Sequence, residues 1–138
     1  MILDKNFNFA VQQALTGTSD VVSSNVLDLT TARKLFEGGG GGKLLITQIA
    51  SGGTTPTLSA RLVGADNAAL TSNPIILAQT GVSDAIVAAD LPRQLEVVPV
   101  LQTTAKRFYG VIFLQGGTSP TATVNAQIVA DSQTNLIK

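Results

Sequence analysis

The fold is indicated first by a stretch that reads Thr57-Leu58-Ser59-Ala60-Arg61-Leu62-Val63, in which polar and apolar side chains alternate. The alternation places Leu58, Ala60 and Leu62 on one face. Period-two alternation over this length is typical of a β-strand with one buried face. A second stretch alternates in the same way and aligns Ala122, Val124, Ala126, Ile128 and Ala130. The sequence therefore predicts two half-buried strands.

Shorter apolar runs, rich in Val, Ile and Leu, predict further strands. These runs are Leu44–Ala50, Ile75–Gln79, Ala85–Ala89, Leu95–Leu101 and Phe108–Gln115, with two more candidates around Phe9–Gln13 and Asn25–Leu29. Pro99 has no N–H to donate to a ladder, so its strand is expected to lie at an edge or to be bulged there. Short helical turns remain an open alternative for Asn6–Leu15 and for Thr31–Phe36.

Turn-forming residues separate these runs. The clusters are Ser51–Gly53, Gly64–Asn67, Ser72–Pro74, Asp90–Pro92 and Gly116–Pro120. Strands of this length at such regular spacing, with no helical pattern alternating between them, are typical of sandwiches and barrels. A chain of 138 residues fits one domain. We therefore expect an all-β fold, a jelly-roll-like antiparallel sandwich of two sheets with flexible terminal arms, over residues 1–138.

The composition is poor in charge. Charged residues make up 13% of the chain, against about 25% in average soluble domains, and nine basic residues balance nine acidic ones. The basic pairs Arg33-Lys34 and Lys106-Arg107 stand alone, whereas nucleic-acid binding draws on clustered cations. A surface of neutral hydrogen-bonding side chains suits a protein docked in an assembly. We expect no nucleic-acid partner.

No segment approaches the roughly 18 uninterrupted apolar residues of a membrane-spanning helix. Residues 1–6 include Asp4 and Lys5, where a signal peptide would need a long apolar stretch. The expectation is a protein made in the cytoplasm, with no membrane partner.

Residues with reactive side chains are scarce. The chain has no His and no Cys, so it lacks the usual base of a catalytic triad and the usual ligands of zinc. Most of the nine acidic residues are scattered beside turn residues, as Asp66, Asp84 and Asp90 are, and they form no calcium-binding loop. We expect no catalytic, cofactor-binding or metal-binding residues, and only the scattered carboxylates leave an enzyme open as an alternative.

A glycine run, Gly38–Gly42, precedes Lys43 and superficially resembles a phosphate-binding loop. Glu37 falls where that pattern needs its first glycine, and Leu44 falls where it needs Ser or Thr. A strand is also expected to follow, in place of a helix N-terminus. The run is therefore interpreted as a loose connecting loop.

Both ends of the chain carry apolar residues among polar ones. Residues 1–8 are interpreted as an N-terminal arm and residues 132–138 as a C-terminal tail. Terminal segments fray unless they dock, so their apolar residues are candidate contacts with a partner, with packing on the chain's own core equally open. These candidate contacts are Ile2, Leu3, Phe7, Phe9, Leu136 and Ile137.

Four stretches together carry a resemblance to a known family. They are Met1–Asn6, Ser24–Leu29 (Ser-Asn-Val-Leu-Asp-Leu), Lys106–Val111 (Lys-Arg-Phe-Tyr-Gly-Val) and Val124–Gln133. In order and spacing the chain resembles the Bbp16-type capsid cement (decoration) proteins of tailed bacteriophages. The resemblance spans nearly the whole chain, although Gly38–Gly42 and Ala65–Asn73 depart from the family's pattern.

The resemblance implies a jelly-roll-like fold and a position on the outer surface of the virion capsid. It also implies two partners, the phage major capsid protein and further copies of this chain, in a homodimer or homotrimer. A receptor- or glycan-binding module of a phage virion is the alternative. The aromatic residues Phe108, Tyr109 and Phe113 lie in a core-like strand, where burial is expected, which speaks against platforms for sugar stacking.

Overall fold

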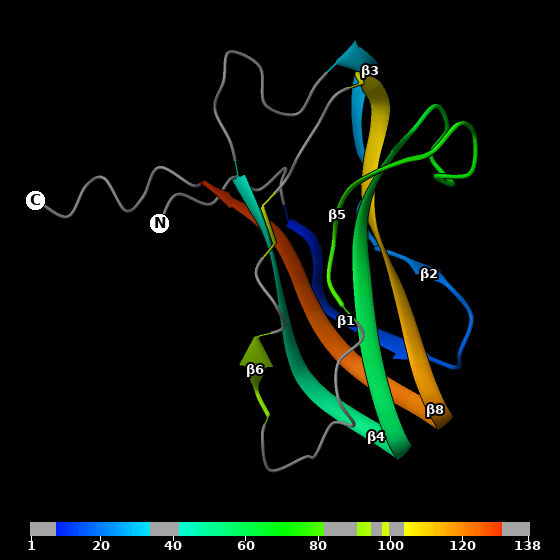
Figure 1. The fold of residues 1–138 in the computed structure, drawn as a ribbon, viewed down its shortest axis with the longest axis vertical. Coiled ribbons are helices and arrows are strands. Elements are labelled where there is room, and N and C mark those ends of the chain that lie inside the picture. Colours follow the sequence, from blue (N-terminus) through cyan, green and yellow to red (C-terminus); the bar gives the residue numbers. More distant parts are fainter. Residues whose placement is uncertain (1–7, 34–41, 82–90, 95–97, 100–103, 131–138) are drawn as a thin grey trace, which may run out of the picture.

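The computed structural model describes residues 8–33, 42–81, 91–94, 98–99 and 104–130. They form strands and no helix, joined in one antiparallel sheet, so the predicted all-β class is confirmed. The strands are β1 (Asn8–Thr16), β2 (Val21–Val22), β3 (Leu27–Arg33), β4 (Gly42–Ala65), β5 (Ile75–Gln79), β6 (Arg93–Gln94), β7 (Val98–Pro99) and β8 (Lys106–Ala130) (Figure 1).

Two long strands, β4 and β8, organise the whole sheet. They have 24 and 25 residues and pair antiparallel from Gly42 opposite Ala130 to Ala65 opposite Phe108. Every other described strand pairs with one of these two. A straight strand of this length would reach roughly 80 Å. Both strands instead bend midway, at the lower end of Figure 1.

The bend divides the sheet into two layers that face each other (Figure 1). The first layer holds residues 42–52 of β4 and 121–130 of β8, with β1, β6 and β7 beside them. The second layer holds residues 57–65 of β4 and 106–116 of β8, with β2, β3 and β5. Because the ladder continues through the bend, the structure is one folded sheet, and the prediction of two separate sheets is not confirmed.

The main core lies between the two layers. Leu58, Ala60 and Leu62 are buried, as their alternation predicted. From β8 the described side chains of the second alternating stretch are buried too, and so are Tyr109 and Phe113. The core is completed by Leu44 and Ile46 from the first-layer half of β4, Phe9 and Leu15 of β1, and Leu77 of β5.

The bend is built from a hexapeptide that the chain contains twice. Gly52–Thr57 reads Gly-Gly-Thr-Thr-Pro-Thr, and Gly116–Thr121 reads Gly-Gly-Thr-Ser-Pro-Thr. The two copies pair with each other, because Gly52 lies opposite Thr121 and Thr57 lies opposite Gly116. The bend therefore has an approximate local two-fold symmetry.

The backbone of the two copies follows the same path. Gly53 and Gly117 have φ values of +97° and +105°, and Thr55 and Ser119 both have +47°. A Cβ added to Gly53 would lie 2.6 Å from the carbonyl oxygen of Ser119, and one added to Gly117 would lie 2.6 Å from that of Thr55. Only glycine has both the conformation and the space at these two positions.

Ser51–Gly53 and Gly116–Pro120 were predicted to be turns that separate strands, and this prediction was wrong, because both segments lie inside paired strands. A glycine-rich segment ends a strand when the chain must leave the ladder. Here each segment has its own copy as a partner across the ladder, so both strands turn the corner and remain paired. The Gly64–Asn67 and Ser72–Pro74 predictions hold, since β4 ends at Ala65 and β5 begins at Ile75.

The helical alternatives were wrong wherever the structure describes them. Asn8–Thr16 is β1 and Leu27–Arg33 is β3, and the ladder to β8 holds both as strands. Asn8 thus belongs to a strand and not to an arm, and Gly42 belongs to β4 and not to the glycine loop. β7 pairs only with β4 among the described elements, which places Pro99 at a sheet edge, as predicted. The predicted strand Ala85–Ala89 lies outside the described residues.

We expect Gly53→Ala and Gly117→Ala to destabilise the fold by similar amounts. Gly17→Ala is the matched control, because Gly17 also has a positive φ, of +80°, but nothing lies within 4 Å of its added Cβ. Gly17→Ala should lower the free energy of unfolding by about 1 kcal/mol, from the backbone conformation alone. In the two bend variants the free energy of unfolding should fall by about 1–3 kcal/mol more, because the two backbones must also move apart. Urea denaturation measures the stability of all three variants. If the two bend variants are no less stable than Gly17→Ala, the close approach of the two backbones does not constrain the bend.

Candidate interaction surface

The outer face of the second layer carries a second apolar cluster. Outward positions of a half-exposed sheet are usually polar, yet the end of β4 is buried on both faces. The cluster consists of Val63, Ala65, Leu70 and Ile112, with Val22, Val26 and Phe108 packed against it. Segments 20–26 and 66–74 supply the residues from outside β4 and β8.

A groove of about 350 Å³ remains open on this face. Part of its rim is apolar and exposed, since Ile76 of β5 is 56% accessible and Pro74 is exposed as well, while Arg61 and the exposed Gln79 form a polar part. Leu114, an outward residue of β8, is 37% accessible. The lining residues are Arg61, Val63, Leu70, Pro74, Ile76, Gln79 and Ile112. Exposed apolar side chains around a concavity are typical of a surface that binds a partner.

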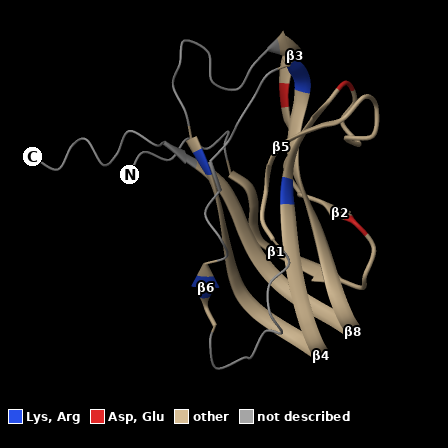
Figure 2. Cartoon of the chain, in the orientation of Figure 1, with Lys and Arg blue, Asp and Glu red and all other residues tan. Residues whose placement is uncertain are grey.

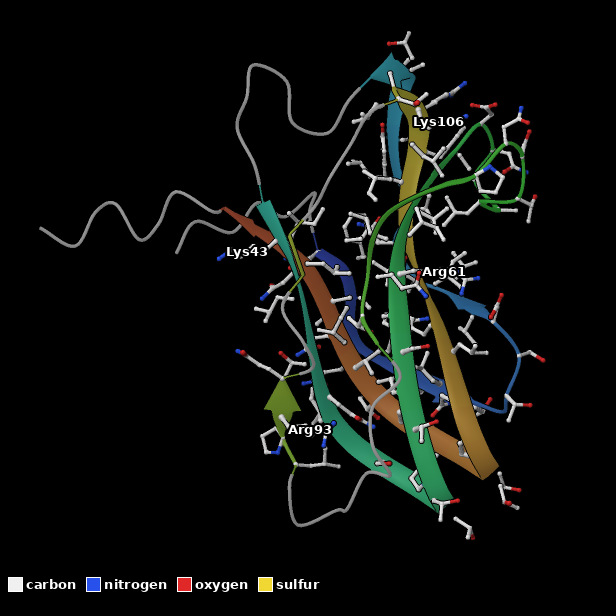
Figure 3. The ribbon with its side chains drawn as sticks, in the orientation of Figure 1. Lys43, Arg61, Arg93 and Lys106 are labelled. Atoms are coloured by element: carbon white, nitrogen blue, oxygen red, sulfur yellow. The ribbon has the colours of Figure 1, made fainter. Side chains whose placement is uncertain are left out.

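A charge pair lies at this groove. Arg61, at the middle of the second-layer half of β4 (Figure 3), donates from Nη2 to Oδ2 of Asp20 at 3.0 Å. Their side chains are 26% and 52% exposed. Asp20 immediately precedes β2, so the bond crosses β8. The groove therefore has an ion pair beside its apolar residues. Charged positions elsewhere on the ribbon are scattered singly or in pairs (Figure 2).

The wall of the groove formed by segment 66–74 is held by its own side chains. Oδ1 of Asn67 accepts hydrogen bonds from the backbone N–H groups of Thr71 and Ser72. Asn73 donates from Nδ2 to Oδ2 of Asp66 at 3.0 Å. Lys106 Nζ lies 3.4 Å from the other Asp66 oxygen and ties the segment to β8. The groove therefore has a preformed wall.

Asp28 and Asp66 are both held in the ionised form. The hydrogen bonds from Arg107, first, and from the Thr30 N–H lower the pKa of Asp28 below its usual value. The hydrogen bond from Asn73, followed by the charge of Lys106, lowers the pKa of Asp66. Arg107 Nε lies 2.8 Å from Asp28 Oδ1, and its guanidinium stacks 4.8 Å from the centre of the Phe108 ring. The basic pair at 106–107 is thus engaged in two separate surface ion pairs.

We expect stability to fall in acid through these two carboxylates. A lowered folded pKa means that the unfolded chain binds protons first, so the stabilisation is complete above the unfolded value of 3.8 and is lost as the pH falls through the folded pKa. The urea concentration at the unfolding midpoint should therefore fall as the pH is lowered across this range. Asp28→Asn and Arg107→Gln should each flatten that decline, and an unchanged slope in both would contradict the assignment.

Two of the edge strands of the sheet, β1 and β5, are bulged. Leu62 pairs with Ala78 and Val63 with Ile76, which leaves Leu77 of β5 without an opposite residue. In β1 the register shifts twice, and the N–H of Gln12 turns to Oδ1 of Asn125. Bulges at edges hinder the addition of further strands. The β1 and β5 edges are therefore poor candidates for pairing with an added strand.

Of the predicted contact residues, the structure describes Phe9, and here the open alternative, packing on the chain's own core, is what it shows. It is fully buried in the main core, because the start of β1 pairs with β8 and turns Phe9 between the layers. It can therefore make no contact with a partner in the folded chain. The other predicted contacts lie outside the described residues: Ile2, Leu3, Phe7, Leu136 and Ile137.

Sequence reasoning missed the groove. The available signal was the apolar outward residues Val63, Ile112 and Leu114, which lie on the face opposite to the predicted buried positions. The alternation assigns only Leu58, Ala60 and Leu62 to a face, and the run at 108–115 is interpreted as a core-like strand without separating its two faces. Nothing in the local pattern shows which outward residues the segments 20–26 and 66–74 cover.

Among the described residues, no three acidic, His or Cys side chains gather as a metal site would require. The same part of the chain contains no helix long and apolar enough to cross a membrane. Tyr109 and Phe113 are buried, and Phe108 is partly buried beneath Arg107, so these aromatic rings offer no exposed platform. The glycine run at 38–41 lies outside the described residues.

Comparison of the sequence with protein-family models and with curated proteins finds no match.

Proposed function

We propose that this protein is a structural capsid cement protein of a tailed phage, which binds the outer surface of the icosahedral shell and bridges major capsid protein subunits. The observation that carries the proposal is the second-layer face, where a preformed, partly apolar groove lies on a chain with no net charge. The resemblance of the sequence to capsid cement proteins supplies the kind of partner. The jelly-roll topology of that family is part of the proposal.

The folded sheet suits a mechanical role. Contacts through neutral hydrogen-bonding groups and small apolar patches are individually weak, and a standard-size contact buries on the order of 800 Å² per partner. An oligomer that holds several such contacts makes the later ones intramolecular, which raises avidity without new chemistry. Bridges of this kind oppose the outward pressure of packaged DNA.

The charge balance fits a position outside the shell. A protein on the inside would face the phosphates of the genome, for which clustered cations are favourable. Here nine basic residues balance nine acidic ones, and three described cations are paired with Asp20, Asp28 and Asp66. Such a surface gains little from proximity to DNA.

The test is co-sedimentation of the purified protein with capsids that lack it. We expect saturable binding, close to one copy for each major capsid subunit. Binding should change little when the salt concentration is raised, because few charges are available to be screened. DNA-filled capsids should then withstand heating better with the protein than without it.

A protein that ignores capsids would contradict the proposal. The same preparation should be tested against cell-surface glycans of the host, since affinity for them would favour the receptor-binding alternative. Capsid binding that disappears at moderate salt would also count against contact through this neutral face.

A further inference from the structure

We infer that Gln48 and Arg93 hold ordered water between them, in an internal hydration site at the edge of the core, with Ser51 beside it. The site is separate from the groove, and it does not depend on capsid binding. Among the described residues, three buried side-chain atoms have no hydrogen-bond partner: Oε1 of Gln48, Oγ of Ser51 and Nε of Arg93. Buried polar atoms are nearly always bonded to protein or to ordered water, so these exceptions need an explanation.

The three residues lie on one face of the sheet. Gln48 of β4 is directly opposite Val124 of β8 on one side and Arg93 of β6 on the other (Figure 3). Ser51 is directly opposite Ala122. Directly opposite residues of an antiparallel ladder share a face, and Val124 and Ala122 belong to the main core. Gln48, Ser51 and Arg93 therefore all lie on the inner face of the first layer.

A β-bulge in β4 brings Gln48 and Ser51 to the same face. They are three positions apart, which in a regular strand would place them on opposite faces. The register with β8 shifts between Gln48 and Ala50, and this shift turns both residues inward. The Gln48 side chain extends along the bulge, since its Nε2 donates to the carbonyl oxygen of Ala50 at 3.3 Å. One end of the amide is thus fixed, while its oxygen has no donor.

The chemistry of these atoms selects water. Gln48 Oε1 can only accept a hydrogen bond, and Arg93 Nε can only donate one. A group that bridges them must donate to the first and accept from the second, as water does. An anion such as chloride would accept from Arg93 and leave Gln48 Oε1 without a donor. The Ser51 hydroxyl can donate or accept, so it can bond the same water or a neighbouring one.

Burial makes the missing hydrogen bonds costly. Gln48 is 1% exposed, and Arg93 is partly buried. Within the described part of the chain no carboxylate pairs with Arg93, whereas the three other cations with recorded ion pairs each bind an aspartate. A buried polar group without a partner costs more free energy than the immobilisation of a water molecule. Water at this position is therefore favoured.

The second layer shows that the fold itself does not require polar residues here. β2 pairs with β8 as β6 pairs with β4, so that Val21 lies opposite Phe113 as Arg93 lies opposite Gln48. Both pairs precede the bend on their long strand. Phe113 is fully buried, and Val21 packs against the main core. Corresponding places therefore hold an apolar pair in one layer and a polar pair in the other, which makes the polar pair specific to this site.

The test is NMR detection of bound water on the wild-type chain in solution. We expect cross-peaks from long-lived water to both the Gln48 side-chain amide and the Arg93 Nε–H. Hydroxyl protons exchange with water and can relay such peaks, so Ser51→Ala is the control, in which both contacts should remain. Their loss in that variant, or the absence of long-lived water in the wild type, would overturn the inference. Saturable shifts of the Arg93 Nε–H on addition of sodium chloride would overturn it in favour of an anion site.

A double-variant cycle tests whether the two residues share the water. Gln48→Met and Arg93→Met keep long side chains but remove the polar atoms. Each should lower the urea midpoint, and the double variant should lose less than the sum of the two, because the second change removes a group that the first left unsatisfied. Thr47→Met and Gln94→Met are the matched control, since this pair is adjacent in the same ladder and on the opposite face. Its effects should add.

Two results of the cycle would count against the site. Additive losses at Gln48 and Arg93, with every variant folded by circular dichroism, would mean that the two residues share nothing. Coupled losses without any long-lived water would mean that the two side chains bond directly.

Discussion

The fold depends above all on the pairing of the two Gly-Gly-Thr-x-Pro-Thr segments. Two strands of more than twenty residues can turn a corner together only if both backbones bend at the same place and remain paired. Gly53 and Gly117 meet this condition because each lies against the carbonyl oxygens of the other copy. The bend brings the apolar faces of the two halves together and so creates the core.

The smaller strands depend on that frame, and their positions decide what the surface offers. β1, β6 and β7 pair with the first layer, and β2, β3 and β5 pair with the second. Bulges blunt both β1 and β5. The segments 20–26 and 66–74 contribute to an apolar cluster on the outer face of the second layer. The uncovered part of that face, with Arg61, Asp20 and Leu114, is what we propose a partner recognises.

A preformed surface and sparse charge are consistent with a mechanical role in an assembly. Asn67 and Asp66 hold the wall of the groove in place before any partner arrives, which lowers the ordering entropy that binding would otherwise require. The two charges at the groove add little energy at a solvated surface.

The amino-acid sequence alone was sufficient to predict the all-β class and the inward residues of the alternating stretches, such as Leu58, Leu62 and Val124, because period two is a local property of the pleated backbone. It was also sufficient to show that His and Cys chemistry is absent. The three-dimensional arrangement was needed to show that Ser51–Gly53 and Gly116–Pro120 are bends inside strands, since a glycine pair reads as a turn until its partner across the ladder is known. It was needed as well to show that Phe9 is core, and that Ile76, Leu114 and Arg61 share one open face. Those outcomes depend on which distant segments pair with or cover a residue, and no local pattern carries that information.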